Sequence, residues 1–399
     1  MLRWSEEQLL YRRAVRRFVE TVIAPQREAL EFEGLPPYGV LRQFYQEFGV
    51  GVSALERFEA TMDGGPRPSR SAAEKLIPLV EFCRWCPGVS VALGTSIDLC
   101  AGAILRAGTD EQKRRWVPDL LTLDKIGAWA ITEPDSGSDA FGGMKSTARP
   151  VDDGWLLNGT KTFISNAPYA DTMVFICKLD DGSDTPHRAR PIVTFVLDST
   201  MPGLQRSKPM RKMGQHSSPT GELHLADVMV TEDRLLRGPD KTEKPGNTSG
   251  AKSTFAMERA STAAMALGII ERCLELSVEY AKTRVQFGRP IGDYQLIQLK
   301  LAKMEVARLN TENMLLQYIS MADEGVRPSL AEASAVKLYS AQAAMEVALE
   351  AVQVFGGNGY MSENHVEQLC RDAKVLQIYA GTDEIQVRAI ARDLLGSGR

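Results

Sequence analysis

The feature that most constrains the fold is a change in hydrophobic periodicity that occurs twice along the chain. Residues 1–124 show apolar positions at helical spacing, 125–237 show short strand-like runs, and 251–399 return to helical spacing. With 399 residues, 44% of them hydrophobic, the chain is long enough for two or three domains with substantial cores. The pattern predicts an α+β protein: a helical N-terminal domain, a middle antiparallel β domain, a linker at 238–250 and a C-terminal helical bundle.

Local signals place several element ends. Ser5 and Thr109 each precede a helical pattern with acids in the first turn, which is typical of an N-cap. The long pattern "SAVKLYSAQAAMEVALEAVQVF" is expected to end at Gly356-Gly357, because glycine adopts backbone angles that stop a helix. In the middle region the dipeptides Asp153-Gly154 and Asn158-Gly159 predict hairpin turns.

Charge and hydropathy argue against nucleic acid and membranes as partners. The net charge is −4 and no long basic run occurs. The apolar stretch Val89–Leu105 is interrupted by Asp98 and falls short of the ~20 residues that span a bilayer. The N-terminus is rich in arginine, but Glu6, Glu7 and Glu20 argue against a transit peptide. We therefore expect a cytoplasmic protein.

The cysteines and histidines do not indicate a metal site. Of six cysteines only Cys83 and Cys86 are close together, without a second pair or a neighbouring histidine. Buried thiols are the expected state of such residues. The four histidines show no ligand spacing, so no metal is assigned.

Three segments could carry chemistry. The loop "AITEPDSGSD" offers small donors that could hold a polar heterocycle or a phosphate, although ordinary turn chemistry explains it equally well. The "GGNGY" segment could approach a pyrophosphate or could simply end a helix. Glu258 lies beside turns of small residues, where partial desolvation would raise its pKa towards that of a general base. The alternative is a first-turn glutamate favoured by the helix dipole. No dinucleotide or Walker motif is present.

Several separated segments, in order, resemble the acyl-CoA dehydrogenase family. They are "AITEPDSGSD", "LNGTKTFISNA", "KMGQHSSPTGELHLADVMV", "RVQFGRPIGDYQLIQLKLAKM", "AVQVFGGNGY" and "RDAKVLQIYAGTDEIQ", spread over roughly residues 105 to 396. The resemblance implies FAD bound between the β domain and the C-terminal bundle and across a subunit contact.

Site residues follow from the resemblance by motif. The residues implied around the isoalloxazine ring are Trp129, Ile131, Thr132, Phe163, which stands where the family more often has Trp, and Ser165. Those implied to reach the FAD of a neighbouring subunit are Arg284, Phe287, Gln295, Gln353 and Gly357, and Thr382 and Glu384 are also implied to lie against FAD. The implied substrate contacts are Ser138, Phe255, Arg259 and Tyr379.

The resemblance also implies the catalytic groups. Many family members carry the catalytic glutamate directly after the tyrosine of "IYAGTDEI", where this chain has Ala380. In the isovaleryl-CoA and long-chain subgroups the base lies instead in a Glu-Arg pair after the linker, which matches Glu258 and Arg259 here. The backbone N–H of Ala380 and a ribityl hydroxyl of FAD are then implied as donors to the enolate oxygen.

The leading hypothesis is oxidation of an acyl-CoA to the 2,3-enoyl-CoA, with Glu258 removing the α proton and FAD N5 accepting the β-hydride. An electron-transfer flavoprotein as acceptor and a homotetramer are family expectations. Three alternatives stay open: a flavin oxidase or monooxygenase on the same fold, an enzyme for carrier-protein thioesters, and a non-catalytic thioester-binding protein. The long polar linker, and Ala256 where the family often has an acid, both lie where the acyl carrier would bind, so free CoA is favoured and a carrier-protein thioester stays open.

Overall fold

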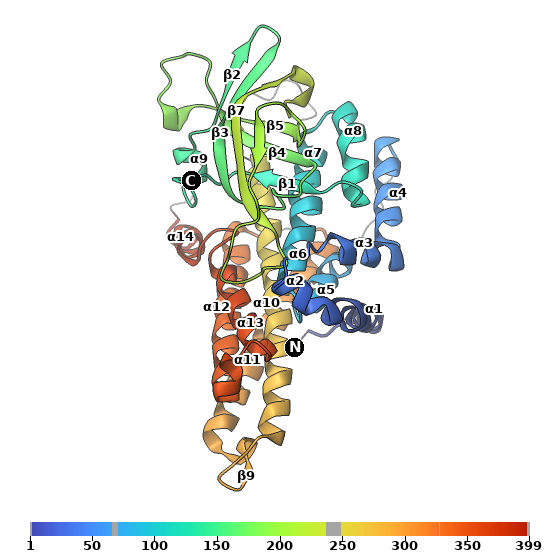
Figure 1. The fold of residues 1–399 in the computed structure, drawn as a ribbon, viewed down its shortest axis with the longest axis vertical. Coiled ribbons are helices and arrows are strands. Elements are labelled where there is room, and N and C mark those ends of the chain that lie inside the picture. Colours follow the sequence, from blue (N-terminus) through green and yellow to red (C-terminus); the bar gives the residue numbers. More distant parts are fainter. Residues whose placement is uncertain (1, 66–70, 237–248, 327, 397–399) are drawn as a thin grey trace.

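The computed structural model describes residues 2–65, 71–236, 249–326 and 328–396, and of 249–257 only the backbone. Figure 1 shows the β domain at one end of the long axis and the C-terminal helices running to the other end, with the N-terminal helices along one side. The predicted order of helical, β and helical parts is therefore confirmed, whereas most of the predicted linker lies outside the described residues.

The N-terminal part is helical, and its caps are the predicted ones. Ser5 accepts a hydrogen bond from the Gln8 backbone N–H, and the Gln8 side chain caps the Ser5 N–H in return. Thr109 and Gln112 form the same capping box. The α-helices are α1 Glu6–Phe18, α2 Arg27–Glu31, α3 Tyr38–Glu47, α4 Val50–Met62, α5 Ala72–Phe82, α6 Pro87–Gly94, α7 Gly102–Ala107 and α8 Asp110–Leu121, with π-helical turns η1 Val19–Ile23 and η3 Thr95–Ala101 and a 3₁₀ turn η2 Ala24–Gln26.

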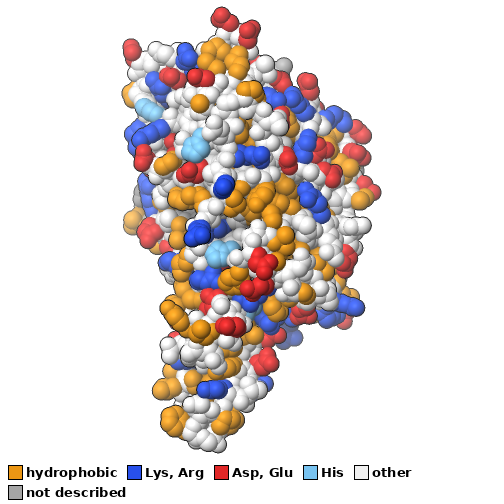
Figure 2. Space-filling view, viewed as in Figure 1, with side chains coloured by type: hydrophobic (Ala, Val, Ile, Leu, Met, Phe, Trp, Pro, Cys, Tyr) orange, Lys and Arg blue, Asp and Glu red, His pale blue; other side chains and the backbone are white. Residues whose placement is uncertain are grey.

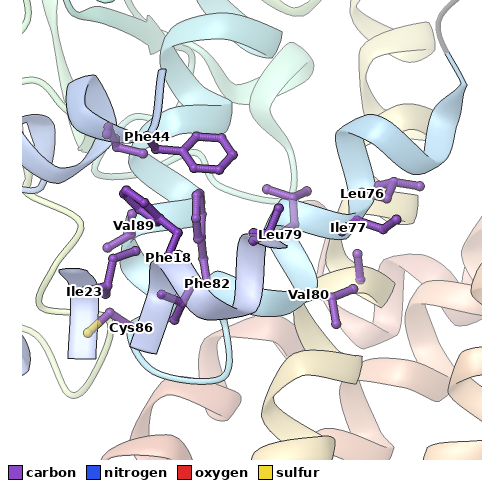
Figure 3. Close-up of a cluster of buried hydrophobic side chains, with 14 of the residues drawn as sticks. Phe18, Ile23, Phe44, Leu76, Ile77, Leu79, Val80, Phe82, Cys86 and Val89 are labelled. Atoms are coloured by element: carbon purple, nitrogen blue, oxygen red, sulfur yellow. The ribbon is translucent and has the colours of Figure 1, made fainter. Parts of the chain in front are cut away.

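Aromatic packing fixes the arrangement of these helices. The Phe44 ring on α3 meets Phe18 on α1 and Phe82 on α5 edge to face, with centroids 5.3 and 5.0 Å apart. Figure 3 shows these rings together with Val89 on α6. Three helices and the start of a fourth therefore share one core.

The run Pro87–Ala107 corrects one expectation. Elements α6, η3 and α7 form a continuous helix of 21 residues, which by length and composition alone could cross a membrane. The expectation that this stretch is too short was wrong. Half of the run is buried inside the protein, and the core helix of a water-soluble protein passes the same test.

The middle part is a seven-stranded sheet with the order β1-β4-β2-β3-β7-β6, and β5 pairs with β4. The expected antiparallel pairing holds for β2/β3, β3/β7, β4/β5 and β6/β7, whereas β1 and β2 each run parallel to β4. The strands are β1 Gly127–Ala130, β2 Thr147–Val151, β3 Gly154–Ser165, β4 Thr172–Leu179, β5 Ile192–Asp198, β6 Leu204–Arg206 and β7 Thr220–Val230, with the short helix α9 Ala140–Gly143 between β1 and β2 and 3₁₀ turns η4 His187–Ala189 and η5 Glu232–Arg234.

One predicted turn is present and the other is not. Val151 pairs with Gly154, so the hairpin predicted at Asp153-Gly154 joins β2 to β3. Asn158-Gly159 lies inside β3, at a register shift against β7. The glycine is needed there because a Cβ at Gly159, φ +146°, would lie 2.1 Å from Ser146 Oγ. The dipeptide therefore marks a bulge and not a turn.

The C-terminal part is a helical bundle built around α10. Its third long helix, α12, ends at Phe355 as predicted, and Gly356 has φ +59°. The elements are α10 Ser249–Thr283, β8 Val285–Gln286, β9 Arg289–Pro290, η6 Ile291–Asp293, α11 Gln295–Asp323, α12 Leu330–Phe355, η7 Gly356–Tyr360, α13 His365–Lys374, η8 Val375–Gln377 and α14 Asp383–Leu394.

The hydrophobic cores cross the predicted domain borders. Ala264 and Leu267 on α10 belong to the N-terminal core, whereas Met265 and Ile269 on the same helix belong to the C-terminal core. A further core joins N-terminal helices to the sheet. Figure 2 shows positive and negative side chains interspersed over the face in view, with hydrophobic side chains gathered near the middle of the molecule.

Candidate active site

The predicted site residues fall into three groups in the structure. The first lies at an edge of the β domain, where β1 and β3 come together. The second lies around Glu258 on α10 and the turn Tyr379–Gly381 before α14. The third lies around the β8–β9 hairpin, which Figure 1 places at the far end of the long axis from the sheet.

The first group combines apolar side chains with hydroxyl-bearing residues at the ends of β1 and β3. Phe163 lies where β3 shifts register against β7, with φ +57°, and its residue surface is 65% exposed. The Thr162 N–H donates to the Thr132 carbonyl at 2.9 Å, which brings the end of β1 beside this bulge. Trp129 is half-buried and Ile131 is buried. Ser165, at the end of β3, is also half-buried.

A buried ion pair between Lys161 and Glu133 fixes the backbone next to the first group. The Lys161 ammonium donates to Glu133 Oε1 at 2.8 Å and to the Ile131 carbonyl at 3.0 Å. The Glu133 carboxylate also accepts from the backbone N–H of Ser146 at 3.0 Å. Burial would raise the pKa of Glu133, but the Lys161 charge and these hydrogen bonds lower it. The loop that begins at Ile131 is therefore held from inside the domain.

Glu258 is a half-buried glutamate with one buried carboxylate oxygen. Its Oε2 atom is inaccessible and has no hydrogen-bond partner among the described residues. Burial raises the pKa of Glu258 to about 7; the Arg259 and Lys337 charges oppose this rise and the Asp98 charge adds to it. A carboxylate with that pKa takes up a proton readily near neutrality, which a general base requires.

Arg259 has a structural role in the packing of α10 on α12. Its Nη1 atom donates to Ser334 Oγ at 3.1 Å and to the Leu330 carbonyl at 3.4 Å. Only 5% of the residue is exposed. These contacts fix the α10 turn that carries Glu258, and a substrate contact by Arg259 stays a prediction.

The turn before α14 is fixed by hydrogen bonds that its carbonyl groups accept. Lys337 Nζ donates to the Gly381 carbonyl at 2.8 Å, and Gln386 Nε2 donates to the carbonyls of Ala380 and Gly381 at 3.1 and 2.8 Å. Thr382 caps α14 through its hydroxyl, and Glu384 lies exposed in the first turn. Ala380 has φ +53° and is 9% exposed. Within the described residues its N–H has no acceptor, so it can donate to a bound ligand.

The third group is not brought to the other two within one chain. Phe287 at the tip of the hairpin is 95% exposed, and Arg284 and Gln295 are exposed beside it. Asn358 Nδ2 donates to Tyr280 Oη at 2.9 Å, which brings the Gly357 end of α12 to the hairpin. Gln353 lies on the last turn of α12 and is exposed. The group is thus a surface open to another molecule.

The predicted substrate contacts at Ser138 and Phe255 stay predictions. Ser138 is exposed on the loop before α9, and the Phe255 side chain lies outside what the structure describes.

All six cysteines are free thiols, five of them buried, and burial raises the pKa of Cys100 and Cys177 to about 12. No group of metal-binding side chains occurs among the described residues.

Sequence reasoning missed the residues that hold the site from behind. Two fully buried residues, Lys337 and Gln386, fix the Ala380 turn. The Asp98 charge raises the pKa of Glu258. The available signal was a single polar residue on an otherwise small or apolar helix face, as in "SAVKLYSAQAA". An isolated buried lysine needs carbonyl or carboxylate partners, which points to a nearby chain end or turn.

The residues present fit a flavin. Phe163 is exposed and Trp129 is half-buried, so both offer apolar surface, and Thr132 and Ser165 offer hydroxyl groups. An amphipathic planar ring with polar edges matches such a surface. The buried Glu258 oxygen, which has no partner in the part of the chain that the structure describes, is the kind of group that a bound ligand would satisfy.

Comparison with known proteins accounts for the whole chain. Models of the acyl-CoA dehydrogenase N-terminal, middle and C-terminal domains match residues 5–124, 128–228 and 248–395. An acyl-CoA dehydrogenase of Bacillus subtilis is 36% identical over 394 residues, 98% of this chain and 99% of that protein. Mitochondrial isovaleryl-CoA dehydrogenase of Arabidopsis thaliana is 33% identical, over 98% of this chain and 92% of that protein. The structure of butyryl-CoA dehydrogenase from Megasphaera elsdenii superposes with a TM-score of 0.86 at 31% identity, covering 99% of this chain and 100% of that one.

Proposed function

Because this chain belongs to the acyl-CoA dehydrogenase family, we propose that it oxidises the Cα–Cβ bond of an acyl-CoA thioester with Glu258 as the base. The observation that carries the proposal is the buried Glu258 oxygen, which has no partner among the described side chains and belongs to a carboxylate whose burial raises its pKa to about 7. The product is the 2,3-enoyl thioester.

The chain's own groups divide the work as follows. Glu258 takes the proton that leaves Cα, and the electrons of that bond move towards the thioester carbonyl. The Ala380 N–H, whose neighbouring carbonyls are held by Gln386 and Lys337, donates to the carbonyl oxygen and stabilises the developing negative charge. The chemistry that bound FAD supplies is acceptance of the hydride from Cβ.

Trp129, Thr132, Phe163 and Ser165 are proposed to hold the ring of FAD. The hairpin group around Phe287 is proposed to serve the FAD of another copy, since Figure 1 shows it far from the sheet of its own chain. A residue that is 95% exposed and aromatic supports burial against a partner. A homotetramer, an electron-transfer flavoprotein as acceptor and a cytoplasmic location belong to the same proposal.

The test is anaerobic reduction of the FAD-loaded protein by a panel of acyl-CoAs, followed by the loss of the flavin absorbance band. Glu258→Gln keeps the size of the side chain but removes the base, and should slow reduction by about 10²–10⁴-fold. Glu279→Gln is the matched control, because Glu279 is an exposed glutamate on the same helix. Reduction by Glu258→Gln at the wild-type rate would rule out Glu258 as the base.

The same assay separates the alternatives. Rapid reoxidation by oxygen with substrate present identifies an oxidase or monooxygenase. Reduction by carrier-bound thioesters alone identifies a carrier-protein enzyme. Thioester binding without any loss of flavin absorbance identifies a binding protein.

A further inference from the structure

We propose that Lys337 is a positioning residue which, together with Ser334 on the same face of α12, sets the Ala380 N–H at a fixed place relative to Glu258. Neither Lys337 nor Ser334 is among the residues assigned to substrate or FAD. The inference rests on the proposed function, because the separation matters only if Glu258 removes the α proton while the Ala380 N–H binds the thioester carbonyl.

Ser334 and Lys337 form a polar row on a buried face of α12. They lie three residues apart in the helix, which places both side chains on one side of it. Neither residue has any exposed surface. Helix α12 packs against α10, which carries Glu258, and against α14, which follows the Ala380 turn (Figure 1). One helix is therefore in contact with both parts of the proposed site.

Ser334 holds the helix turn that carries Glu258. Arg259, the residue after Glu258, donates from Nη1 to Ser334 Oγ at 3.1 Å and to the Leu330 carbonyl at 3.4 Å. Ser334 Oγ in turn donates to the Leu330 carbonyl at 2.6 Å. The single hydroxyl proton is thus used within α12, and the oxygen accepts from Arg259. These bonds attach the start of the Glu258 turn to the first turns of α12.

Lys337, one turn further along α12, holds the segment before α14. Its Nζ atom donates to the Gly381 carbonyl at 2.8 Å and forms an ion pair with Asp383 Oδ1 at 3.4 Å. Asp383 Oδ2 accepts from Gln342 Nε2, also on α12, and from Gln377 Nε2, which precedes the turn, both at 3.2 Å. The Ala380 turn is therefore closed between its two ends and attached to α12.

The backbone at Ala380 needs this support. Its φ of +53° lies in the left-handed region, which residues other than glycine seldom adopt. The Gly381 carbonyl follows the Ala380 N–H by two peptide planes, so a lysine that fixes this carbonyl limits how far the N–H can turn away. Gln386 holds the Ala380 carbonyl between them. The direction of a donor to a developing charge matters, since a displacement of about 1 Å can cost about 10²-fold in rate.

The first measurement is kcat and KM of the FAD-loaded protein with an acyl-CoA and an artificial electron acceptor. Lys337→Met keeps an unbranched side chain but removes the donor. It should lower kcat by about 10–100-fold, with KM changed by less than about 3-fold. Lys303→Met, at an exposed lysine on α11, is the matched control and should change neither value.

A pH series separates positioning from the charge of Lys337. That charge lowers the pKa of Glu258, so its loss alone moves the midpoint of the kcat profile to higher pH and leaves the plateau above the midpoint unchanged. A misplaced N–H lowers the plateau itself. Full recovery of kcat in Lys337→Met at high pH would therefore overturn the positioning role.

The carbonyl group of a bound ligand reports the N–H directly. The infrared C=O stretching frequency of an isotope-labelled enoyl-CoA is lowered by a hydrogen bond to the oxygen, and in Lys337→Met it should move back towards the value of the unbound ligand. Ser334→Ala loosens the α10 side of the row, so it should lower kcat and leave the frequency unchanged. An unchanged frequency in Lys337→Met, or an equal change in Ser334→Ala, would show that Lys337 does not place the N–H.

A second variant covers the case in which Lys337→Met does not fold. Lys337→Met combined with Asp383→Asn leaves no carboxylate without its counter-charge. A wild-type plateau and a wild-type carbonyl frequency in that variant would overturn the proposal.

Failure of the proposed function would be seen separately. If no acyl-CoA reduces the flavin of the wild-type protein, the proposed oxidation is wrong. The carbonyl frequency of the bound thioester then still decides whether Lys337 places the Ala380 N–H.

Discussion

At the scale of single residues, Glu258 is a buried acid whose state changes near neutral pH. Burial raises its pKa to about 7, Arg259 and Lys337 counter that rise, and Asp98 adds to it. Asp98 is itself paired with Lys75 at 2.6 Å on the neighbouring helix α5. The proton affinity of the proposed base is therefore set by charges from three different elements, α10, α12 and η3.

The pH dependence of catalysis should report this residue. A base works when it is deprotonated, so kcat/KM should rise as pH increases through about 7 and level off above it. Asp98→Asn removes a negative charge that favours protonated Glu258, so the midpoint should move to lower pH. The measurement is the pH profile of flavin reduction, and Asp152→Asn in the exposed β2–β3 turn should leave it unchanged. An unmoved midpoint in Asp98→Asn would mean that another group controls the profile.

Glu258 should also affect the stability of the fold. Catalysis needs the deprotonated carboxylate, whereas the folded state favours the protonated one. Its folded-state pKa lies above that of an unfolded glutamate, ~4.3. The contribution to stability is thus complete below that value and is lost as pH rises through about 7. At pH 8 Glu258→Gln should raise the unfolding free energy, by at most about 4 kcal/mol. At pH 4 it should have little effect. Thermal unfolding at both pH values checks this, and lower stability of the variant at pH 8 would contradict it.

Sequence analysis could identify site residues that differ in chemical character from the residues around them in the sequence or from the family motif. Glu258 stands out beside small residues, and Ala380 stands out in a motif where the family often has a glutamate. Lys337 could not be found in this way, because its partner is the Gly381 carbonyl, which lies far away in the sequence. Long-range hydrogen bonding leaves no local pattern.

At the scale of secondary-structure elements, helix ends were easier to predict than the course of strands. The capping boxes at Ser5 and Thr109 are local, so the sequence contains them completely. Asn158-Gly159 was misassigned because a turn and a bulge use the same residues. The difference is set by Ser146 on the neighbouring segment and by Asp227, to which the Asn158 amide donates at 2.9 Å. Pairing across a sheet decides between them.

The Lys161–Glu133 pair beneath the β1–β3 edge gives a prediction at this scale. Lys161→Met leaves the buried Glu133 carboxylate without its counter-charge, and should destabilise the protein by about 3–5 kcal/mol. The double variant with Glu133→Gln should recover part of the loss, because no unpaired charge remains. Tm and bound flavin per chain are the measurements. If the double variant is less stable than Lys161→Met, the pair contributes more than charge balance.

At the scale of the whole molecule, buried ion pairs hold the N-terminal helices to the C-terminal bundle. The Glu81 carboxylate on α5 has no exposed side-chain surface and bonds Arg12 at 2.6 Å and Arg16 at 2.8 Å, both on α1. Arg12 and Arg84 also pair with Glu271 on α10. These contacts join three helices from two of the predicted domains.

Acid should weaken this junction. Burial would raise the pKa of Glu81, but the Arg16 hydrogen bond and the charges of Arg12, Arg16 and Arg84 lower it. Its stabilising contribution is therefore present above the unfolded value, ~4.3, and is lost as pH falls through the lower folded value. Glu81→Gln should cost about 3–5 kcal/mol at pH 7, and the difference from wild type should shrink as pH falls below 4.

The matched control is Glu305→Gln, which breaks a pair of Glu305 with Arg308 on the surface of α11. That change should cost less than about 1 kcal/mol. Unfolding in urea at a series of pH values measures both. Equal costs for the two variants would show that burial of Glu81 adds nothing to its ion pairs.

The helix α10 limits how this protein can be recombined with its relatives. Neighbouring residues of the helix, such as Ala264 and Met265, enter different cores, one shared with the N-terminal helices and one with the bundle. A chimera joined before α10 at residue 248, where the C-terminal family match begins, would exchange part of the N-terminal core along with the bundle. We therefore expect a chimera of two homologues to fold well only if the N-terminal helices and the C-terminal bundle, which both pack on α10, come from the same parent. The boundaries of the family matches then do not mark segments that can be exchanged independently.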